Sequence, residues 1–187
     1  MKQKEILLLG ATGQIGRNLI RKLSKSNYKI TAATRNIHTA GYKLKTQANP
    51  GYLNLVEIKN FSEKNIENLL RNCDICINLI GILYETKKNQ FKTIHTDLPD
   101  LISKKAKEFN IEKLIHLSSL GVENSRDSIY AESKFNGEQK IKKNFKKSII
   151  VKPSIVYSVD DNFTTNFMTL LSRLPVIPLY YNGQTKF

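Results

Sequence analysis

Tyr130 and Lys134 stand four residues apart, a spacing that places both side chains on one face of a helix. In such a pair the ammonium favours the ionised form of the phenol and can also bond a sugar hydroxyl. The tyrosine can then act as a general acid or base toward a carbonyl or hydroxyl group. Ser118 and Ser119 end the preceding apolar run, where either hydroxyl could hold the reacting oxygen. These four residues form the candidate catalytic group.

Three glycines spaced three apart follow the first apolar run of the chain, residues 6–9. This pattern predicts a buried strand, a tight turn and a helix whose N-terminus faces a pyrophosphate. Gly10 and Gly13 allow backbone angles and a close phosphate approach that a Cβ would block, and Gly16 lets the helix pack tightly on the strand. The alternative interpretation is a glycine turn with a structural role only.

Arg35 stands 19 residues beyond Gly16, at the end of a predicted second strand over 29–34. An aspartate or glutamate at this place would bond the ribose 2′-hydroxyl of NAD, whereas an arginine suits the 2′-phosphate of NADP. The next acidic residue is Glu57, so we expect no carboxylate near Arg35. NADP(H) is therefore predicted over NAD(H), and a solvated loop cation is the alternative.

Strand-like and helix-like segments alternate along the rest of the chain. Further strands are expected over 55–58, 75–80, 114–117 and 148–151, helices over 63–70, 90–109, 130–144 and 163–174, and an irregular stretch over 36–54. The alternation predicts an α/β doubly wound parallel sheet (Rossmann fold) with helices on both faces. We expect a dinucleotide-binding domain over residues 1–174. Residues 175–187 then read as the start of a truncated C-terminal substrate region.

Composition limits the possible partners. The chain has 187 residues, enough for one well-packed domain, and a formal net charge of +14. The basic residues are spread along the chain without an arginine-rich or aromatic-interleaved tract, so we expect no nucleic acid partner. No run approaches the roughly 20 apolar residues of a membrane span. We expect a cytoplasmic protein without a signal peptide.

Cys73 and Cys76 form a C-x-x-C pair, a spacing that is typical of redox-active and zinc-binding sites. The surrounding residues have the pattern of a buried strand, in which side chains three apart project to opposite faces. No second cysteine pair or histidine cluster completes a metal site. Two reduced thiols and no metal site are predicted, and His38, His95 and His116 are interpreted as ordinary histidines.

Taken in order, these residues resemble the short-chain dehydrogenase/reductase superfamily, in its extended or atypical branch, over essentially the whole chain. Within it, the sequence is most similar to the NADPH-binding accessory subunits of respiratory complex I and their bacterial relatives. The segments that carry this similarity are 77–81, 84–86 with Phe91, 112–118, Gly137 with Glu138, 149–154, 161–163 and 177–179.

The resemblance implies a role for individual residues. It assigns the pyrophosphate to Gly10, Thr12, Gly13, Gln14, Ile15 and Gly16. Arg35 would bind the 2′-phosphate, and Lys59 and Asn60 would border the adenine. The nicotinamide ribose would be lined by Leu79, Ile80 and Gly81. The nicotinamide ring would be backed by residues 153–156, including Pro153 and Val156. Two departures stand out: the superfamily's aspartate near the adenine is replaced by Lys59 and Asn60, and the catalytic serine aligns with either Ser118 or Ser119.

Three functions remain open at this point. The first is a protein that holds NADP(H) as a structural ligand and docks on a respiratory complex I-like or other membrane-associated assembly, peripherally on its cytoplasmic or matrix face. The second is an NAD(P)-dependent oxidoreductase or epimerase that uses the serine, Tyr130 and Lys134 on a sugar-nucleotide, isoprenoid or quinone-like substrate. The third, a nucleic-acid binder, has only net charge in its support. We favour the first, because extended enzymes build their substrate pocket largely from residues that would follow position 187.

Overall fold

The computed structural model describes residues 3–125, 127–158 and 161–174. The chain divides into two compact units, Met1–Lys152 and Pro153–Phe187. The boundary that we predicted after residue 174 concerns a segment, 175–187, that lies outside the described residues. That domain boundary therefore stays a prediction.

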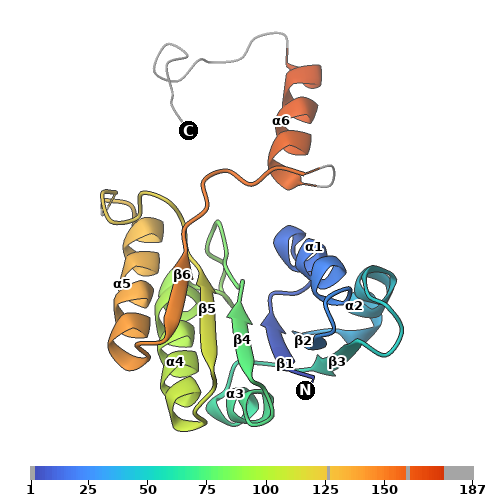
Figure 1. Ribbon diagram of the computed structural model, residues 1–187. Coiled ribbons are helices and arrows are strands. Elements are labelled where there is room, and N and C mark those ends of the chain that lie inside the picture. The colour runs from blue at the N-terminus through green and yellow to red at the C-terminus, as the bar shows by residue number, and fades with distance from the viewer. Residues whose placement is uncertain (1–2, 126, 159–160, 175–187) are drawn as a thin grey trace. The chain divides into compact units, whose positions relative to one another are not determined.

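A single six-stranded sheet forms the first unit (Figure 1). All neighbouring strands are parallel, and their order is β3-β2-β1-β4-β5-β6. The strands are β1 (Glu5–Leu9), β2 (Lys29–Thr34), β3 (Leu53–Glu57), β4 (Ile75–Asn78), β5 (Lys113–Leu117) and β6 (Ser148–Val151). The predicted doubly wound Rossmann fold is confirmed. The strand order reverses between β1 and β4, which is where open α/β sheets bind ligands at their carboxyl ends.

Each strand is followed along the chain by a helix. These helices are α1 (Gln14–Leu23), α2 (Ile37–Leu44), α3 (Glu63–Leu70), α4 (Leu98–Glu108) and α5 (Ile129–Asn144) in the first unit, and α6 (Asn162–Arg173) in the second. A short 3₁₀ turn (Lys45–Gln47) follows α2, and a π-helical segment (Lys92–Asp97) leads directly into α4. The sequence predicts one regular helix over 90–109, whereas the structure begins this helix with the π-helical segment. Single π-helical turns of this kind are frequent at functional sites.

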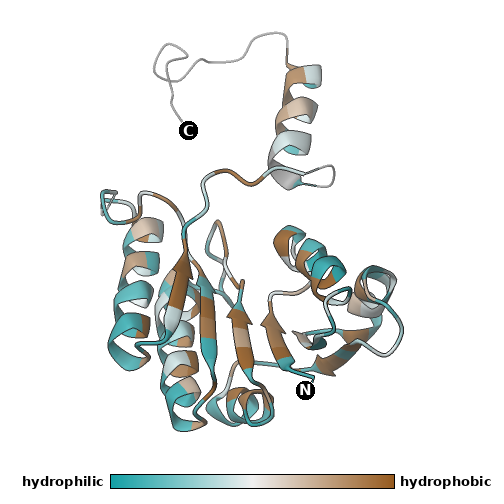
Figure 2. Cartoon of the chain, viewed as in Figure 1, coloured by the Kyte–Doolittle hydropathy of each residue, from teal (hydrophilic) through white to brown (hydrophobic). Residues whose placement is uncertain are grey.

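The core lies on both faces of the sheet, with β1 at its centre. Leu7 and Leu9 pack in one cluster with residues of α3, α4 and α5, whereas Ile6 and Leu8 pack in a second cluster with residues of α1 and α2. Neighbouring side chains of a strand point to opposite faces. Figure 2 shows the result as hydrophobic strands between helices that are hydrophilic on their outer sides. Helices therefore cover both faces, as predicted.

The prediction of an irregular stretch over 36–54 was wrong for its first half, which forms α2. The side chain of Asn36 caps this helix by accepting a hydrogen bond from the Thr39 amide at 3.0 Å. Ala40 and Leu44 lie one turn apart and are buried. The helix has only eight residues and contains Gly41, so its capping residue compensates for a weak helical pattern.

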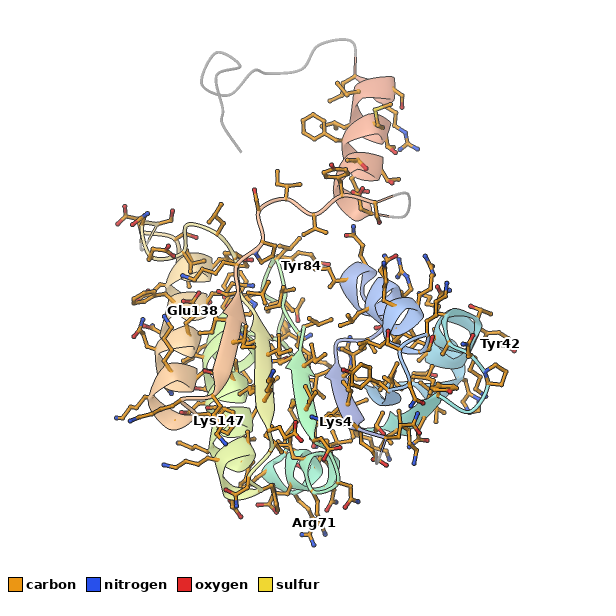
Figure 3. The ribbon with its side chains drawn as sticks, in the orientation of Figure 1. Lys4, Tyr42, Arg71, Tyr84, Glu138 and Lys147 are labelled. Carbon is orange, nitrogen blue, oxygen red and sulfur yellow. The ribbon has the colours of Figure 1, made fainter. Side chains whose placement is uncertain are left out.

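A buried ion pair connects the end of β6 with α5. Glu138, labelled in Figure 3, lies on α5 with its side chain 0% exposed. The Nζ atom of Lys152 lies 3.0 Å from Oε2 of Glu138 and 2.8 Å from Oε2 of Glu123. These carboxylates raise the pKa of the Lys152 ammonium. One lysine thus joins the loop after β5, the end of β6 and the buried side of α5.

Both cysteines are free in the structure. Burial raises the pKa of the Cys73 thiol to about 12 and raises that of the fully buried Cys76 as well. Within the ranges that the structure describes, no three His, Cys, Asp or Glu side chains gather as a metal site would require. The helices of these same ranges are all too short or too polar to cross a lipid bilayer.

Candidate functional site

A cavity of about 410 Å³ opens at the carboxyl ends of β1, β2 and β4, where the strand order reverses. Its volume falls in the range of small-molecule and cofactor sites. The lining residues are Gly10, Thr12, Gly13, Ala33, Thr34, Arg35, Asn36, Thr39, Ala40, Lys43, Ile58, Phe61, Leu79, Ile80, Gly81, Ile82, Asn89 and Ile94. Seven of the predicted site residues therefore share one cavity: Gly10, Thr12, Gly13, Arg35, Leu79, Ile80 and Gly81.

The glycine-rich turn brings backbone close to this cavity. Gly10 has a φ of +79°, and a Cβ there would lie 2.9 Å from the carbonyl carbon of Leu79. A Cβ on Gly16 would lie 2.5 Å from the Ala11 oxygen, so only glycine lets α1 start this near the turn. Gly13 has an ordinary φ of −70° and precedes α1 without a side-chain cap. The special backbone angle therefore belongs to Gly10 rather than to Gly13.

Gln14, Ile15 and Gly16 do not line the cavity; they form the first turn of α1 beside it. The amides of a first helical turn and the positive end of the helix dipole favour a bound anion. No acidic residue lies in this first turn to compete for them. The beginning of α1 is thus electrostatically suited to a phosphate group.

One end of the cavity carries two cations, Arg35 after β2 and Lys43 on α2. Both side chains are exposed, and neither forms a hydrogen bond or ion pair with any residue of the described ranges. Our expectation that no carboxylate lies nearby was wrong, because Glu57 on β3 pairs with Thr34 in the sheet. The Glu57 carboxylate accepts a hydrogen bond from the Ile37 amide at 2.9 Å, in the first turn of α2.

Lys59 and Asn60 are exposed and do not line the cavity. The Asn60 side chain instead accepts a hydrogen bond from the Ser62 amide at 3.2 Å, at the start of α3. The residues that flank this pair, Ile58 and Phe61, form the apolar wall of the cavity.

The other end of the cavity is formed by residues 79–82, directly after β4. Asn78 supports this segment, because its side-chain oxygen accepts a hydrogen bond from the Ile80 amide at 3.1 Å. The Asn78 amide nitrogen lies 3.1 Å from Nδ1 of His116 on β5. Burial, together with the charge of Lys134, lowers the pKa of His116 to about 3. The His116 ring is therefore neutral and can accept this hydrogen bond.

The candidate catalytic residues meet near this end. The Ser119 Oγ atom lies 3.1 Å from the Tyr130 hydroxyl, and the Lys134 Nζ atom lies 5.5 Å from the centre of the Tyr130 ring. Lys134 as a residue is 7% exposed and forms no ion pair within the described ranges. The Ser118 hydroxyl is buried and has no hydrogen-bond partner among the described residues. The structure thus places Ser119, rather than Ser118, beside Tyr130.

His95 lies on the π-helical segment, and the sequence did not predict its position next to the site. Its Nε2 atom lies 3.1 Å from the Ile82 amide and its Nδ1 atom lies 3.0 Å from Ser133 Oγ. It thus contacts both the cavity wall and the turn of α5 between Tyr130 and Lys134. These partners lie 13 and 38 residues away in the chain, so no local motif reveals them.

Pro153 and Val156 belong to the second compact unit. Their expected place behind a nicotinamide ring stays a prediction.

Comparison with known proteins agrees with this geometry. A family model described as NAD(P)H-binding matches residues 10–166. The mitochondrial NADH-ubiquinone oxidoreductase 40 kDa subunit of Neurospora crassa is 26% identical over 82% of this chain and 41% of its own length. The mouse mitochondrial NADH dehydrogenase [ubiquinone] 1 alpha subcomplex subunit 9 is 27% identical over 86% of this chain and 42% of its own length. The chain thus spans less than half the length of these two relatives.

Among solved structures, a putative NAD-dependent epimerase/dehydratase from Bacillus halodurans superposes with a TM-score of 0.72. The match covers 85% of this chain and 74% of the other, at 19% sequence identity, and it shows a shared fold. The family model covers the glycine-rich turn, the cavity and the residues around Tyr130. The chain belongs to the NAD(P)H-binding family of Rossmann-fold proteins.

Proposed function

We propose that the cavity binds NADP(H), with the 2′-phosphate at Arg35 and the nicotinamide end beside Gly81, and that the bound cofactor has a structural role in a larger assembly. The observation that carries this proposal is the arrangement of two cations, each without an ion pair among the described residues, at the two ends of one site. Arg35 lines the cavity after β2, and the Lys134 Nζ atom lies 3.9 Å from the position of a Cβ on Gly81. Lys134 is only 7% exposed and has no carboxylate paired with it among the described residues, so an oxygen-rich ligand is the natural complement of its charge.

The groups between these ends suit a dinucleotide. Gly10, Thr12 and Gly13 line the same cavity, and the first turn of α1, which follows them, would provide amides for the pyrophosphate. Gly10 leaves room for close contact because a side chain there would meet the backbone of Leu79. The Lys134 ammonium would bond the hydroxyls of the ribose next to the nicotinamide.

The preference for NADP(H) is supported by the charges at the Arg35 end. Arg35 and Lys43 both line the cavity there, and together they can neutralise a 2′-phosphate. Glu57 is the carboxylate that could instead bond a 2′-hydroxyl, but it accepts the hydrogen bond of the Ile37 amide. The cationic pair therefore dominates this end of the cavity.

The structural role is supported by the names of the two relatives. One is a subunit of NADH-ubiquinone oxidoreductase and the other is a subunit of the NADH dehydrogenase [ubiquinone] 1 alpha subcomplex. We infer that this chain likewise docks on a respiratory complex I-like or other membrane-associated assembly, as a peripheral component. The cofactor would then stabilise the folded state through mass action, without being consumed.

Replacing Arg35 with aspartate is expected to weaken NADPH binding about tenfold to a hundredfold, since a lost charge-assisted phosphate contact costs about 1.5–3 kcal/mol. NADH binding should change only a few-fold. Titration calorimetry measures both dissociation constants. Lys147→Asp is the matched control, because it makes the same change of charge at an exposed residue that lies just before β6 and outside the cavity wall. Equal affinities of the unmodified protein for NADPH and NADH would contradict the preference.

A second candidate function, an NAD(P)-dependent oxidoreductase or epimerase, is favoured by the 3.1 Å contact between Ser119 and Tyr130. Ser119 could bond a substrate carbonyl oxygen while the Tyr130 hydroxyl gives its proton to that oxygen. The reduced cofactor, when bound, supplies the hydride. A sugar-nucleotide, isoprenoid or quinone-like compound is the candidate substrate.

Tyr130→Phe separates the two functions. If the site is active, this variant should lose turnover and keep NADPH affinity within a few-fold, because only the proton donor is removed. The measurement is oxidation of NADPH, followed by its absorbance, with a panel of carbonyl compounds. Turnover by the unmodified protein that Tyr130→Phe abolishes would overturn the purely structural role.

A further inference from the structure

We propose that His95 is a positioning residue that fixes the shape of the nicotinamide end of the site, by joining the segment 79–82 to the Tyr130–Lys134 turn of α5. This proposal rests on the proposed function, because it assigns that end of the cavity to the nicotinamide half of the cofactor. His95 is 2% exposed and lies behind the cavity wall rather than in it. It would act through the groups that it holds.

The hydrogen bonds of His95 define a single tautomer. The Ile82 amide donates to Nε2 at 3.1 Å, so this nitrogen carries no proton. The proton is therefore on Nδ1, which donates to Ser133 Oγ at 3.0 Å. The Ser133 hydroxyl in turn donates to the Tyr130 carbonyl oxygen at 2.7 Å. Each donor in this series of hydrogen bonds has an acceptor. The series runs from the Ile82 amide in the cavity wall to the Tyr130 carbonyl on α5.

The surroundings keep the ring neutral. Burial and the charge of Lys134 lower the pKa of His95 to about 4. A protonated ring would present an N–H group to the Ile82 amide, and the hydrogen bond between them would be lost. Burial thus keeps His95 an acceptor, and the lysine that is proposed to bind the ribose adds to this effect.

The ring is also held in place by packing. It stacks on Phe91 with ring centres 5.4 Å apart and meets the Tyr130 ring at 90° with centres 5.3 Å apart. Its backbone belongs to the π-helical segment, against which α5 packs through Gly137. The ring therefore has little freedom to turn away from the Ile82 amide.

Two side chains converge on Gly81 as a result. A Cβ at Gly81 would lie 3.7 Å from His95 Nε2 and 3.9 Å from Lys134 Nζ. Removing the imidazole acceptor would release the 79–82 segment and change the distance between Gly81 and the lysine. The Arg35 end of the cavity, formed by β2 and α2, would be unaffected. Loss of His95 should therefore weaken contacts with one half of the dinucleotide only.

The test compares two ligands, NADPH and 2′,5′-ADP, which carries the adenosine and the 2′-phosphate but no nicotinamide. For His95→Phe we expect at least a tenfold loss of NADPH affinity and no more than a twofold change for 2′,5′-ADP. His95→Gln should recover part of the NADPH affinity, since its carboxamide oxygen can accept from the Ile82 amide. In ¹⁵N NMR spectra of the unmodified protein, His95 should keep the Nδ1–H tautomer from pH 8 to pH 5.

The possible results distinguish the positioning role of His95 from the proposed binding of NADP(H) in the cavity. Equal weakening of both ligands by His95→Phe would show general destabilisation and overturn the positioning role, as would no weakening of either. An Nε2–H or protonated ring would overturn it independently of any ligand. An unmodified protein that binds 2′,5′-ADP but not NADPH would instead overturn the proposed function.

Discussion

Replacing Gly137 with alanine is expected to lower the free energy of unfolding by about 3 kcal/mol, as overpacking of a rigid contact does. Gly137 lies on α5, and a Cβ there would be only 1.9 Å from the His95 carbonyl oxygen and 3.1 Å from its carbon. Both atoms are backbone, so no side-chain rotation relieves the overlap. The helix and the π-helical segment would have to separate, and the hydrogen bond between His95 and Ser133 would stretch with them.

Gly41→Ala on α2 is the matched control. Its new Cβ would meet only the end of the Lys45 side chain, at 3.9 Å. Because glycine is a poor helix former, this variant should keep its stability or gain about 0.5–1 kcal/mol. Urea unfolding measures both variants. Equal stabilities for the two would mean that α5 does not approach the π-helical segment as closely as described.

Replacing Lys152 with methionine should lower the free energy of unfolding by about 3–5 kcal/mol, because it leaves a buried charge without its partner. Glu138 is 0% exposed, and within the described ranges Lys152 is the cation that pairs with it. Methionine preserves most of the side-chain volume, so the change tests charge rather than packing. Chemical denaturation at neutral pH measures the effect.

Two further variants isolate the cause. The double variant Lys152→Met, Glu138→Gln removes both charges and should recover most of the lost stability. Glu123→Gln removes only the exposed partner of Lys152 and should cost far less stability than Lys152→Met. A double variant no more stable than Lys152→Met alone would show that the buried ion pair is not the origin of the effect.

Much of the fold followed from local patterns. The unbroken apolar run before Gly10 correctly predicted a buried strand of a parallel sheet, and the last strand, Ser148–Val151, was predicted with its observed bounds. The strand β1 is buried in the sheet, and burial appears in the sequence as a run of apolar residues. The helix α2 was missed because its stability comes from its Asn36 cap and a contact with Glu57, on another strand.

The site was predictable only where a motif lies on contiguous sequence. The glycine-rich turn and the Tyr130, Lys134 pair could be found in this way. The role of His95, the choice between Ser119 and Ser118, and the position of Glu57 near Arg35 depend on which strands and helices become neighbours. Lys43 could not be assigned to the cavity while α2 was unrecognised.

The most direct test of a dinucleotide site at the carboxyl edge of the sheet is a titration with NADPH followed in ¹H–¹⁵N NMR spectra. Saturable shifts with one common dissociation constant are predicted for the amides of Gly10, Gly13 and Gln14 and for those of residues 79–82. The Arg35 side chain should shift with NADPH and much less with NADH. Amides at the opposite edge of the sheet, such as those of Lys113 and Ser148, should remain unchanged. Absence of saturable shifts at the glycine-rich turn, or shifts confined to another surface, would contradict the proposed site.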